Sequence, residues 1–127
     1  MSEHDDQTRV FNWARSMAVI CPELLLLFAI PNGAKLPWIT DRKGRRFSPE
    51  ANRLKDEGMK PGVPDFCLPV ARKGFHGLFI ELKFGRNKPS EQQIWWMDQL
   101  STQGYLATAC WGADQAIMTL QEYVGIV

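Results

Sequence analysis

Apolar residues recur along this chain at two spacings, one typical of helices and the other typical of strands. Over residues 3–19 they fall every three or four positions and place Val10 and Ala14 on one stripe, as in an amphipathic helix with one buried side. Ser2 precedes this segment as an N-cap, and Asp5 stands where its side chain can complete a capping box. The pattern therefore predicts a first helix over this range.

Four short apolar runs predict strands at residues 24–30, 65–70, 78–84 and 105–111. The first run follows the helix breaker Pro22 and is apolar throughout, so we expect a strand buried on both faces. All four runs have the length and composition of strands in a central sheet.

Three further helices complete the predicted order. Ser48-Pro49-Glu50 opens a short helix that ends at Gly58, because Pro favours the first helical position and Gly the position after the last turn. Ser90 begins the next helix with a capping-box pattern, and periodic apolar positions predict a last helix over residues 113–124. Residues 34–48 show no periodicity and predict a long loop, a feature that is often functional.

The composition fits one domain that spans residues 1–127, with 45% hydrophobic residues. No apolar run is long enough to cross a membrane, and the acidic, polar start does not resemble a signal peptide. Cys21, Cys67 and Cys110 have no C-x-x-C spacing, which disfavours zinc and fits a reducing compartment. We therefore expect a cytoplasmic protein without a membrane partner.

The net charge of +1 hides an uneven distribution along the chain. Between Lys35 and Lys88 there are thirteen Lys or Arg and six Asp or Glu, whereas the remainder has two basic and eight acidic residues. A basic central segment suits a polyanionic substrate such as DNA. A solvated, basic surface loop is the alternative interpretation.

The strand predicted at residues 78–84 carries two charges on one face. Side chains alternate across a strand, so Phe79, Glu81 and Lys83 share the face opposite Leu82. Asp65, just after Pro64, opens the neighbouring strand at a point from which it can reach Glu81. Burying such charges is costly unless they are paired or bind a metal. A salt-bridged strand end at the surface is the alternative.

Two converging carboxylates offer the hard oxygen ligands that Mg²⁺ or Mn²⁺ prefers. A lysine beside them can hold the attacking water or stabilise charge that develops on a phosphoryl group. Asp65, Glu81 and Lys83 therefore contain the groups that phosphodiester hydrolysis needs.

The segment Pro64-Asp65, followed by Glu81-Leu82-Lys83, resembles the signature of PD-(D/E)xK nucleases. Its surroundings resemble the VRR-NUC family, in particular the short stand-alone members from phages and bacteria. The resemblance runs from about Glu3 to about Tyr123. It rests on Glu57-Gly58-Met59-Lys60-Pro61-Gly62-Val63-Pro64-Asp65, on Gly77 to Lys83, on Ser90-Glu91-Gln92-Gln93 and on Trp96.

This resemblance implies a restriction-endonuclease-like α/β fold with a mixed central sheet flanked by helices. It implies a Mg²⁺-dependent (or Mn²⁺-dependent) endodeoxyribonuclease in which Asp65, Glu81 and the Leu82 carbonyl bind the metal and Lys83 acts on the attacking water. Members of the family cut branched or flapped DNA, and stand-alone members resemble homodimeric Holliday-junction resolvases. The cytoplasm would be bacterial, or that of the host if the protein is phage-encoded.

Three polar residues have both a structural and a functional interpretation. Glu3 and Gln7 lie at the start of the first helix and match an acidic residue and a glutamine that the family places near the metal, yet an acidic first turn also complements the helix dipole. Gln93 can simply cap its helix, or it can also orient the catalytic lysine.

Basic residues around the site are candidates for phosphate contacts. In the predicted loop Trp38 and Phe47 stand among them and could stack on an unpaired base, although Trp38 could instead fold back on the core. The predicted DNA-binding residues are Gln7, Lys35, Arg42, Lys43, Arg45, Arg46, Arg53, Lys60, Arg86 and Lys88.

Other functions fit the sequence less well. No G-x-G-x-x-G follows the first predicted strand, so a dinucleotide enzyme is disfavoured and no organic cofactor is expected. A flap or fork nuclease, and a DNA-binding module without catalysis, remain alternatives to the resolvase. Trp38 and Trp95 are candidate anchors of a homodimer interface.

Overall fold

The computed structural model describes residues 2–31 and 36–126, and a four-stranded sheet forms its centre. The strand order is β1-β4-β5-β6, in which β1 pairs with β4 and β4 with β5 antiparallel, whereas β5 and β6 are parallel. The sheet is therefore mixed, as predicted. The strands are β1 (Phe28–Ala29), β4 (Phe66–Leu68), β5 (Leu78–Lys83) and β6 (Leu106–Trp111).

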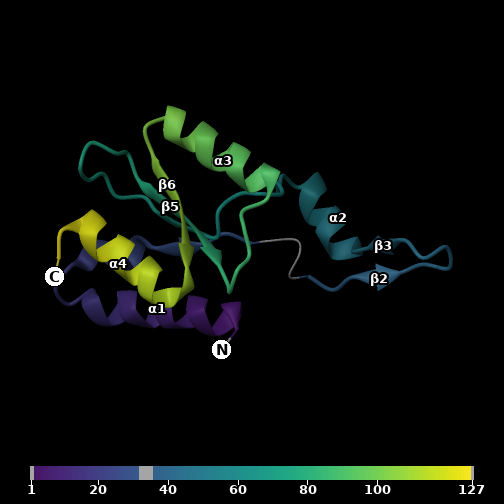
Figure 1. The fold of residues 1–127 in the computed structure, drawn as a ribbon, viewed down its shortest axis with the longest axis horizontal. Helices are drawn as coiled ribbons and strands as arrows, with labels where there is room; N and C mark the ends of the chain where they lie inside the picture. Colours follow the sequence, from purple (N-terminus) through teal and green to yellow (C-terminus); the bar gives the residue numbers. More distant parts are fainter. Residues whose placement is uncertain (1, 32–35, 127) are drawn as a thin grey trace.

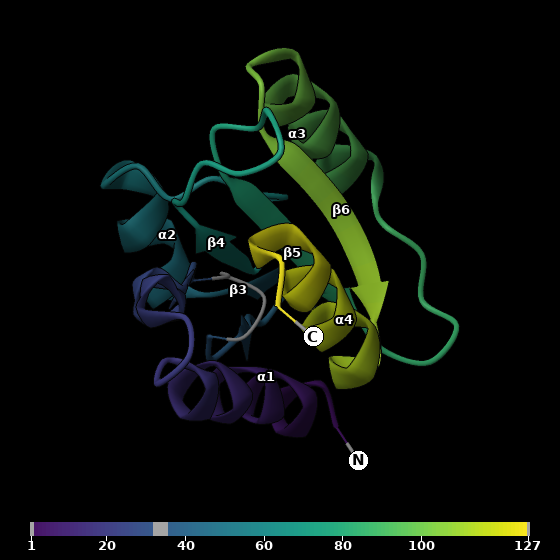
Figure 2. The same cartoon turned by 90° about the vertical axis from the view of Figure 1, so that its left-hand side faces the viewer.

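Helices cover both faces of this sheet (Figures 1 and 2). The helices α1 (Glu3–Met17) and α4 (Gly112–Val124) lie side by side over the face that Leu78, Ile80 and Leu82 share. The third helix, α3 (Glu91–Thr102), runs along β6 and reaches the face that carries Lys83. This is the α/β arrangement expected from the order of elements along the chain.

The hydrophobic core lies between the sheet and the α1–α4 layer. Val10, Ala14, Ile80 and Leu120 are almost completely buried there, with other apolar residues of the same elements around them. The hydroxyl of Tyr123 donates a hydrogen bond of 2.7 Å to the Val70 carbonyl and fixes α4 to the end of β4. The capping boxes predicted at the starts of α1 and α3 are both present.

The strand predicted over residues 24–30 is largely wrong. Pro22–Leu26 form a short 3-10 helix, η1, and only Phe28–Ala29 pair with the sheet. Leu25 is 66% exposed, so the run is not buried on both faces. Pro22 favours a helical first turn, and β1 is the edge strand, where pairing on one side leaves apolar side chains open to solvent.

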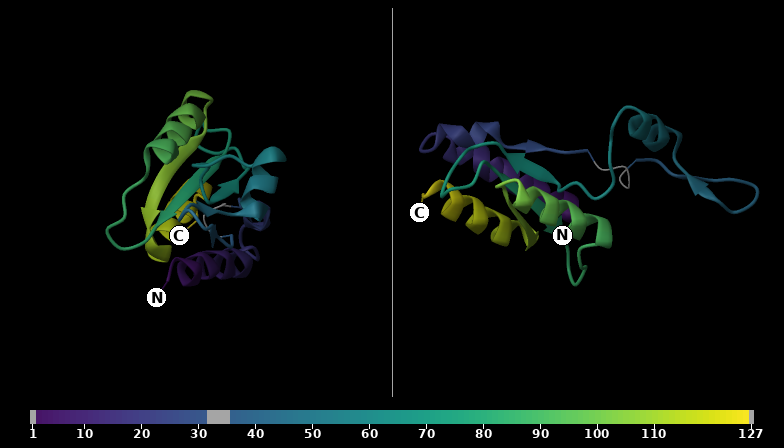
Figure 3. Two further views of the ribbon diagram at one scale, coloured as in Figure 1. Left: turned by 90° about the vertical axis from the view of Figure 1, so that its right-hand side faces the viewer. Right: turned by 90° about the horizontal axis from the view of Figure 1, so that it is seen from above.

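Residues 36–58, here called the arm, project from the body of the protein (Figures 1 and 3). They contain a hairpin of β2 (Ile39–Thr40) and β3 (Arg46–Phe47) and the helix α2 (Pro49–Asp56). The prediction of an unstructured loop over residues 34–48 is therefore wrong for the hairpin. The short helix after Ser48 is confirmed, and Gly58 follows its end with a φ of 109°.

The helix α1, with 15 residues, is followed in length by α4 with 13. Within residues 2–31 and 36–126, no helix combines the length and the apolar character that crossing a bilayer requires.

Candidate active site

Asp65 and Glu81 come together at the end of the antiparallel pair of β4 and β5. Phe66 faces Ile80 in this pair, so Asp65 and Glu81 stand one position further along on adjacent strands. The Asp65 carboxylate accepts a hydrogen bond of 2.7 Å from the Leu82 backbone N–H, and its own carbonyl accepts one of 2.7 Å from Ile30. Both side chains are buried, with 3% of each residue exposed. The predicted convergence of the two carboxylates is present.

Burial and mutual repulsion change the protonation of this pair. The pKa of Glu81 is raised to about 9, first by desolvation and then by the contact with the Asp65 carboxyl, and the Lys83 charge offsets part of this rise. Without a cation Glu81 therefore favours its protonated form at neutral pH. Two buried carboxylates that repel each other are a donor set that fits a divalent cation.

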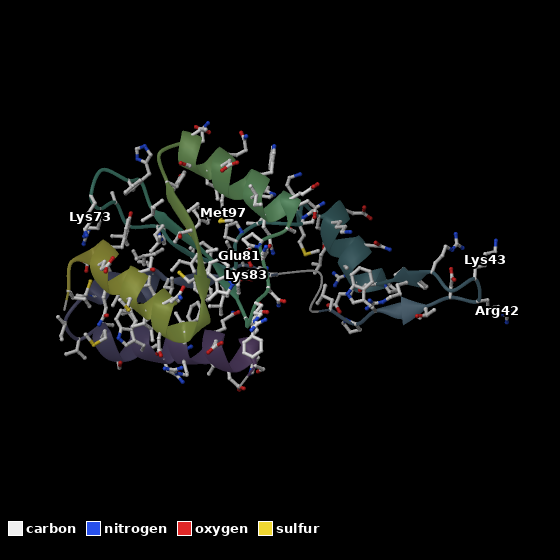
Figure 4. All side chains as sticks on the ribbon, viewed as in Figure 1. Arg42, Lys43, Lys73, Glu81, Lys83 and Met97 are labelled. Carbon is white, nitrogen blue, oxygen red and sulfur yellow. The ribbon has the colours of Figure 1, made fainter. Side chains whose placement is uncertain are left out.

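Lys83 lies between the carboxylates and α3. Its Nζ donates a hydrogen bond of 3.0 Å to Oε1 of Gln93 and lies 3.9 Å from Oε2 of Glu81. The Lys83 side chain is 14% exposed, so most of it is enclosed and a small part reaches solvent. Figure 4 shows Glu81 and Lys83 together at the centre of the molecule, near the base of the arm.

Gln93 has both of the roles that the sequence left open. Its Oε1 accepts a hydrogen bond of 2.8 Å from the Ser90 backbone N–H, which completes the capping box of α3. The same oxygen accepts the hydrogen bond from Lys83 Nζ. The start of α3 and the orientation of the lysine are therefore linked through one atom.

A contact that the sequence did not predict places α3 against the segment before Asp65. The indole Nε1 of Trp96 donates a hydrogen bond of 3.1 Å to the Pro61 carbonyl. Gly62 has a φ of 90°, and a Cβ atom there would lie only 2.7 Å from the backbone of Gln92. Gly62 belongs to the motif before Asp65, but its partner on α3 lies 30 positions away and could not be read from local pattern.

The residues predicted on α1 lie at the edge of this site. Glu3 is partly buried, and its charge contributes to the raised pKa of Glu81. Among the described residues, however, no group of three or more His, Cys, Asp or Glu gathers closely enough to hold a metal, so Glu3 does not join the carboxylate pair in one cluster. Gln7 lines a hollow of about 490 Å³ between α1 and Ala29.

The predicted DNA-binding residues do not form one patch. Arg42 and Lys43 are at the exposed tip of the arm, far from Glu81 and Lys83 (Figure 4). Arg45 instead bonds Asp41 at 2.9 Å, and Arg46 lies over the Trp38 ring at 5.6 Å.

The other predicted basic residues lie nearer the body. Arg53 lies 3.8 Å from Glu50 and 3.6 Å from Glu57 on α2. Lys60, Arg86 and Lys88 are exposed in the segments that lead to β4 and α3. Lys35 lies outside the described residues.

The fold and these residues define a nuclease of the PD-(D/E)xK superfamily, with a restriction-endonuclease-like arrangement of sheet and helices. The profile of the VRR-NUC domain matches residues 45–114, more than half of the chain, and the chain belongs to this family. The matched region contains Asp65, Glu81, Lys83 and Gln93, but neither Glu3 nor Gln7.

A solved structure described as a VRR_NUC domain protein is similar to this chain over almost its full length. The match has a TM-score of 0.74 and 26% sequence identity, and covers 99% of this chain and 90% of the other. No curated protein matches the chain.

Proposed function

We propose that this nuclease is a Mg²⁺-dependent endonuclease that hydrolyses phosphodiester bonds in branched DNA, in the manner of a Holliday-junction resolvase. The observation that carries the proposal is the convergence of Asp65, Glu81 and Lys83 at one buried corner of the sheet. A pathway of DNA repair or recombination would use such an activity.

Asp65, Glu81 and the Leu82 carbonyl are the groups that would hold Mg²⁺ or Mn²⁺, and Glu3 is a candidate to complete the shell. The bound cation would neutralise charge on the scissile phosphate and make water a stronger nucleophile. The site is partly preorganised without a cation. The Leu82 N–H fixes one Asp65 oxygen and leaves the other directed toward Glu81.

Lys83 is the group that would act on the attacking water. Gln93 accepts a hydrogen bond from its Nζ and Glu81 lies 3.9 Å from it, so the ammonium is held beside the carboxylates. The proton that the water loses would pass to a phosphate oxygen of the substrate or to solvent, since a charged ammonium has no lone pair to accept it, and the positive charge would stabilise the pentacoordinate phosphorus that develops. Removing Lys83 would therefore affect the chemical step more than DNA binding.

Phosphate contacts away from the chemistry would come from the basic residues of the arm and of the loops before β4 and α3. Their separation into an arm group and a body group suits DNA that is bent or branched, since a single straight duplex would follow one continuous patch. This distribution supports a branched substrate over a linear one.

A flap or fork nuclease is the second candidate, because the same site cuts one strand at a time. Cleavage of linear, flap, fork and four-way-junction DNA with Mg²⁺ and with Mn²⁺ distinguishes the candidates. The proposal predicts paired, symmetric cuts in the four-way junction and weak cutting of linear duplex. Flap cutting alone would favour the second candidate, and DNA binding without any cut would identify a catalytically silent module.

A further inference from the structure

A hollow of about 510 Å³ lies beside the first turns of α3, and the proposed hydrolysis does not use it. Gln93, which holds the catalytic lysine, lies on the same helix between Gln92 and Trp95. The hollow is therefore within about two helical turns of the reactive groups. It is lined by Lys60, Pro61, Glu91, Gln92, Trp95 and Trp96.

Trp95 is the exposed aromatic wall of this hollow. It is 57% exposed, and its ring stands almost perpendicular to that of Trp96, with the centroids 5.6 Å apart and an interplanar angle of 88°. Trp96 is itself anchored by its hydrogen bond to Pro61. The exposed Trp95 indole therefore packs against a fixed neighbour. Because its side chain is already restricted, a ligand that stacks on it costs less side-chain entropy.

The walls have the chemistry of a site for a nucleotide. Trp95 and Pro61 offer apolar surface, Gln92 and Glu91 offer groups that pair with the polar edge of a base, and Lys60 offers a positive charge for a phosphate. Proteins bind single-stranded nucleic acid with this combination of aromatic platform and cation. A base inside an intact duplex is already stacked and enters such a hollow only at the cost of unstacking and unpairing.

We propose that this hollow receives an unpaired nucleotide of the DNA substrate, with its base stacked on Trp95 and its phosphate at Lys60. The inference rests on the proposed nuclease function and narrows its substrate class to DNA with an unpaired base beside the bond that is cut. A flap or a fork supplies such a base, a four-way junction supplies one only where the pairs at its centre open, and a continuous duplex supplies none.

Binding measured without divalent metal tests the inference separately from cleavage. Fluorescence anisotropy compares a duplex bearing a short single-stranded flap with a fully paired duplex of the same length, for the wild type, for Trp95→Ala and for Ile94→Ala. Ile94 is the matched control, because it is 47% exposed on the same helix and does not line the hollow. Trp95→Ala is expected to reduce the preference for flap over duplex by roughly 10-fold, and Ile94→Ala to leave it unchanged.

A scan with abasic sites identifies the nucleotide that occupies the hollow. If that base stacks on Trp95, removing it should weaken binding of the flap DNA to the wild type by roughly 10-fold. The same abasic DNA should bind to Trp95→Ala no more weakly than the intact flap does. A preference unchanged in Trp95→Ala would overturn the inference, and so would equal weakening for the paired duplex. A change of oligomeric state in light scattering would mean that Trp95 contacts protein instead. Failure of the wild type to cut any DNA would disprove the nuclease proposal but would leave this binding result interpretable.

Discussion

Glu81 differs from an ordinary charged residue at a strand end in its burial and in its neighbour. Only 3% of it is exposed, and it lies against the carboxyl of Asp65. Folding such a pair without a compensating cation is unfavourable, because both groups lose hydration and repel each other. The arrangement fits the divalent cation that we propose for this site.

Removing one carboxylate should separate catalysis from DNA binding. Asp65→Asn and Glu81→Gln each keep the shape of the side chain but remove a negative charge, so cleavage should fall by at least ~10³-fold. Affinity for DNA should stay within about two-fold, since basic residues elsewhere supply most of the phosphate attraction. Single-turnover cleavage and anisotropy measure the two effects. Cleavage at the wild-type rate in either variant would disprove the assignment of the metal site.

The Glu81→Gln variant also has a stability readout. Because Glu81 has to take up a proton on folding at neutral pH when no cation is bound, replacing it with the neutral Gln should leave the melting temperature unchanged or raise it in EDTA. Added Mg²⁺ should raise the melting temperature of the wild type but not that of the variant.

At the scale of the elements, α3 positions Lys83, the proposed catalytic lysine, through its first turn. Lys83 depends on Gln93, Gln93 depends on the start of the helix, and the helix is placed by the Trp96–Pro61 hydrogen bond and by the close packing at Gly62. Pro61 and Gly62 come just before Asp65 in sequence. One short segment therefore positions both a carboxylate and the partner of the lysine.

Disturbing this contact should lower kcat more than it raises KM. Trp96→Phe retains an aromatic ring but removes the hydrogen bond, and should cost about 1 kcal/mol of stability. Tyr123→Phe is the matched control, because it removes a hydrogen bond of 2.7 Å to the Val70 carbonyl away from the site. Similar decreases of stability in the two variants, with a fall in kcat only for Trp96→Phe, would support a positioning role. Equal kcat values would contradict it.

The Asp41 side chain stabilises the turn of the arm hairpin. The Asp41 carboxylate accepts hydrogen bonds of 2.9 Å from the backbone N–H groups of Lys43 and Arg45, and these bonds lower its pKa below the ordinary value of 3.8. The stabilisation from a lowered carboxyl pKa is present above the unfolded value and is lost as the pH falls through the folded value. NMR shifts of the Lys43 and Arg45 amides should therefore titrate with a midpoint below pH 3.8. A midpoint above that value would show that the turn is not held in this way.

Charge at the tip of the arm should contribute to DNA affinity. Neutralising Arg42 and Lys43 to Gln should reduce the slope of log K against log salt by about one unit for each phosphate that the arm no longer neutralises. Arg72→Gln with Lys73→Gln is the control, since Figure 4 places Lys73 at the opposite end of the molecule. Equal slopes in all three proteins would mean that the arm does not contact the DNA backbone.

At the scale of the whole molecule, the sequence predicted the elements that have strong local signals. Spacing alone was enough to predict that Glu81 and Lys83 share one strand face. It was also enough to predict the capping boxes at Ser2 and Ser90. The β2–β3 hairpin could not, because each strand has only two residues and the turn depends on the Asp41 side chain. The Trp96–Pro61 contact could not be predicted either, because it joins residues that are 35 positions apart in the sequence.

The arm has few buried residues and exposes several apolar side chains. Among its described residues only Ser48 and Ala51 are buried, whereas Trp38, Ile39 and Phe47 are 38%, 49% and 36% exposed. A two-stranded hairpin is marginally stable at best by itself. Apolar side chains on such a projecting segment are suited to contact a second protein surface.

Two copies of this chain should form a two-fold dimer through their arms. Resolving a four-way junction needs two symmetric cuts, and a two-fold dimer supplies two identical sites on one DNA surface. Light scattering at micromolar concentration should give twice the 14.5 kDa mass of the chain. Ile39→Asp should shift it to a monomer that no longer makes paired junction cuts, whereas Met118→Asp, 57% exposed on α4, should not. A wild-type monomer that still makes paired cuts would contradict the dimer, and a monomer that cuts only flaps would favour the flap nuclease.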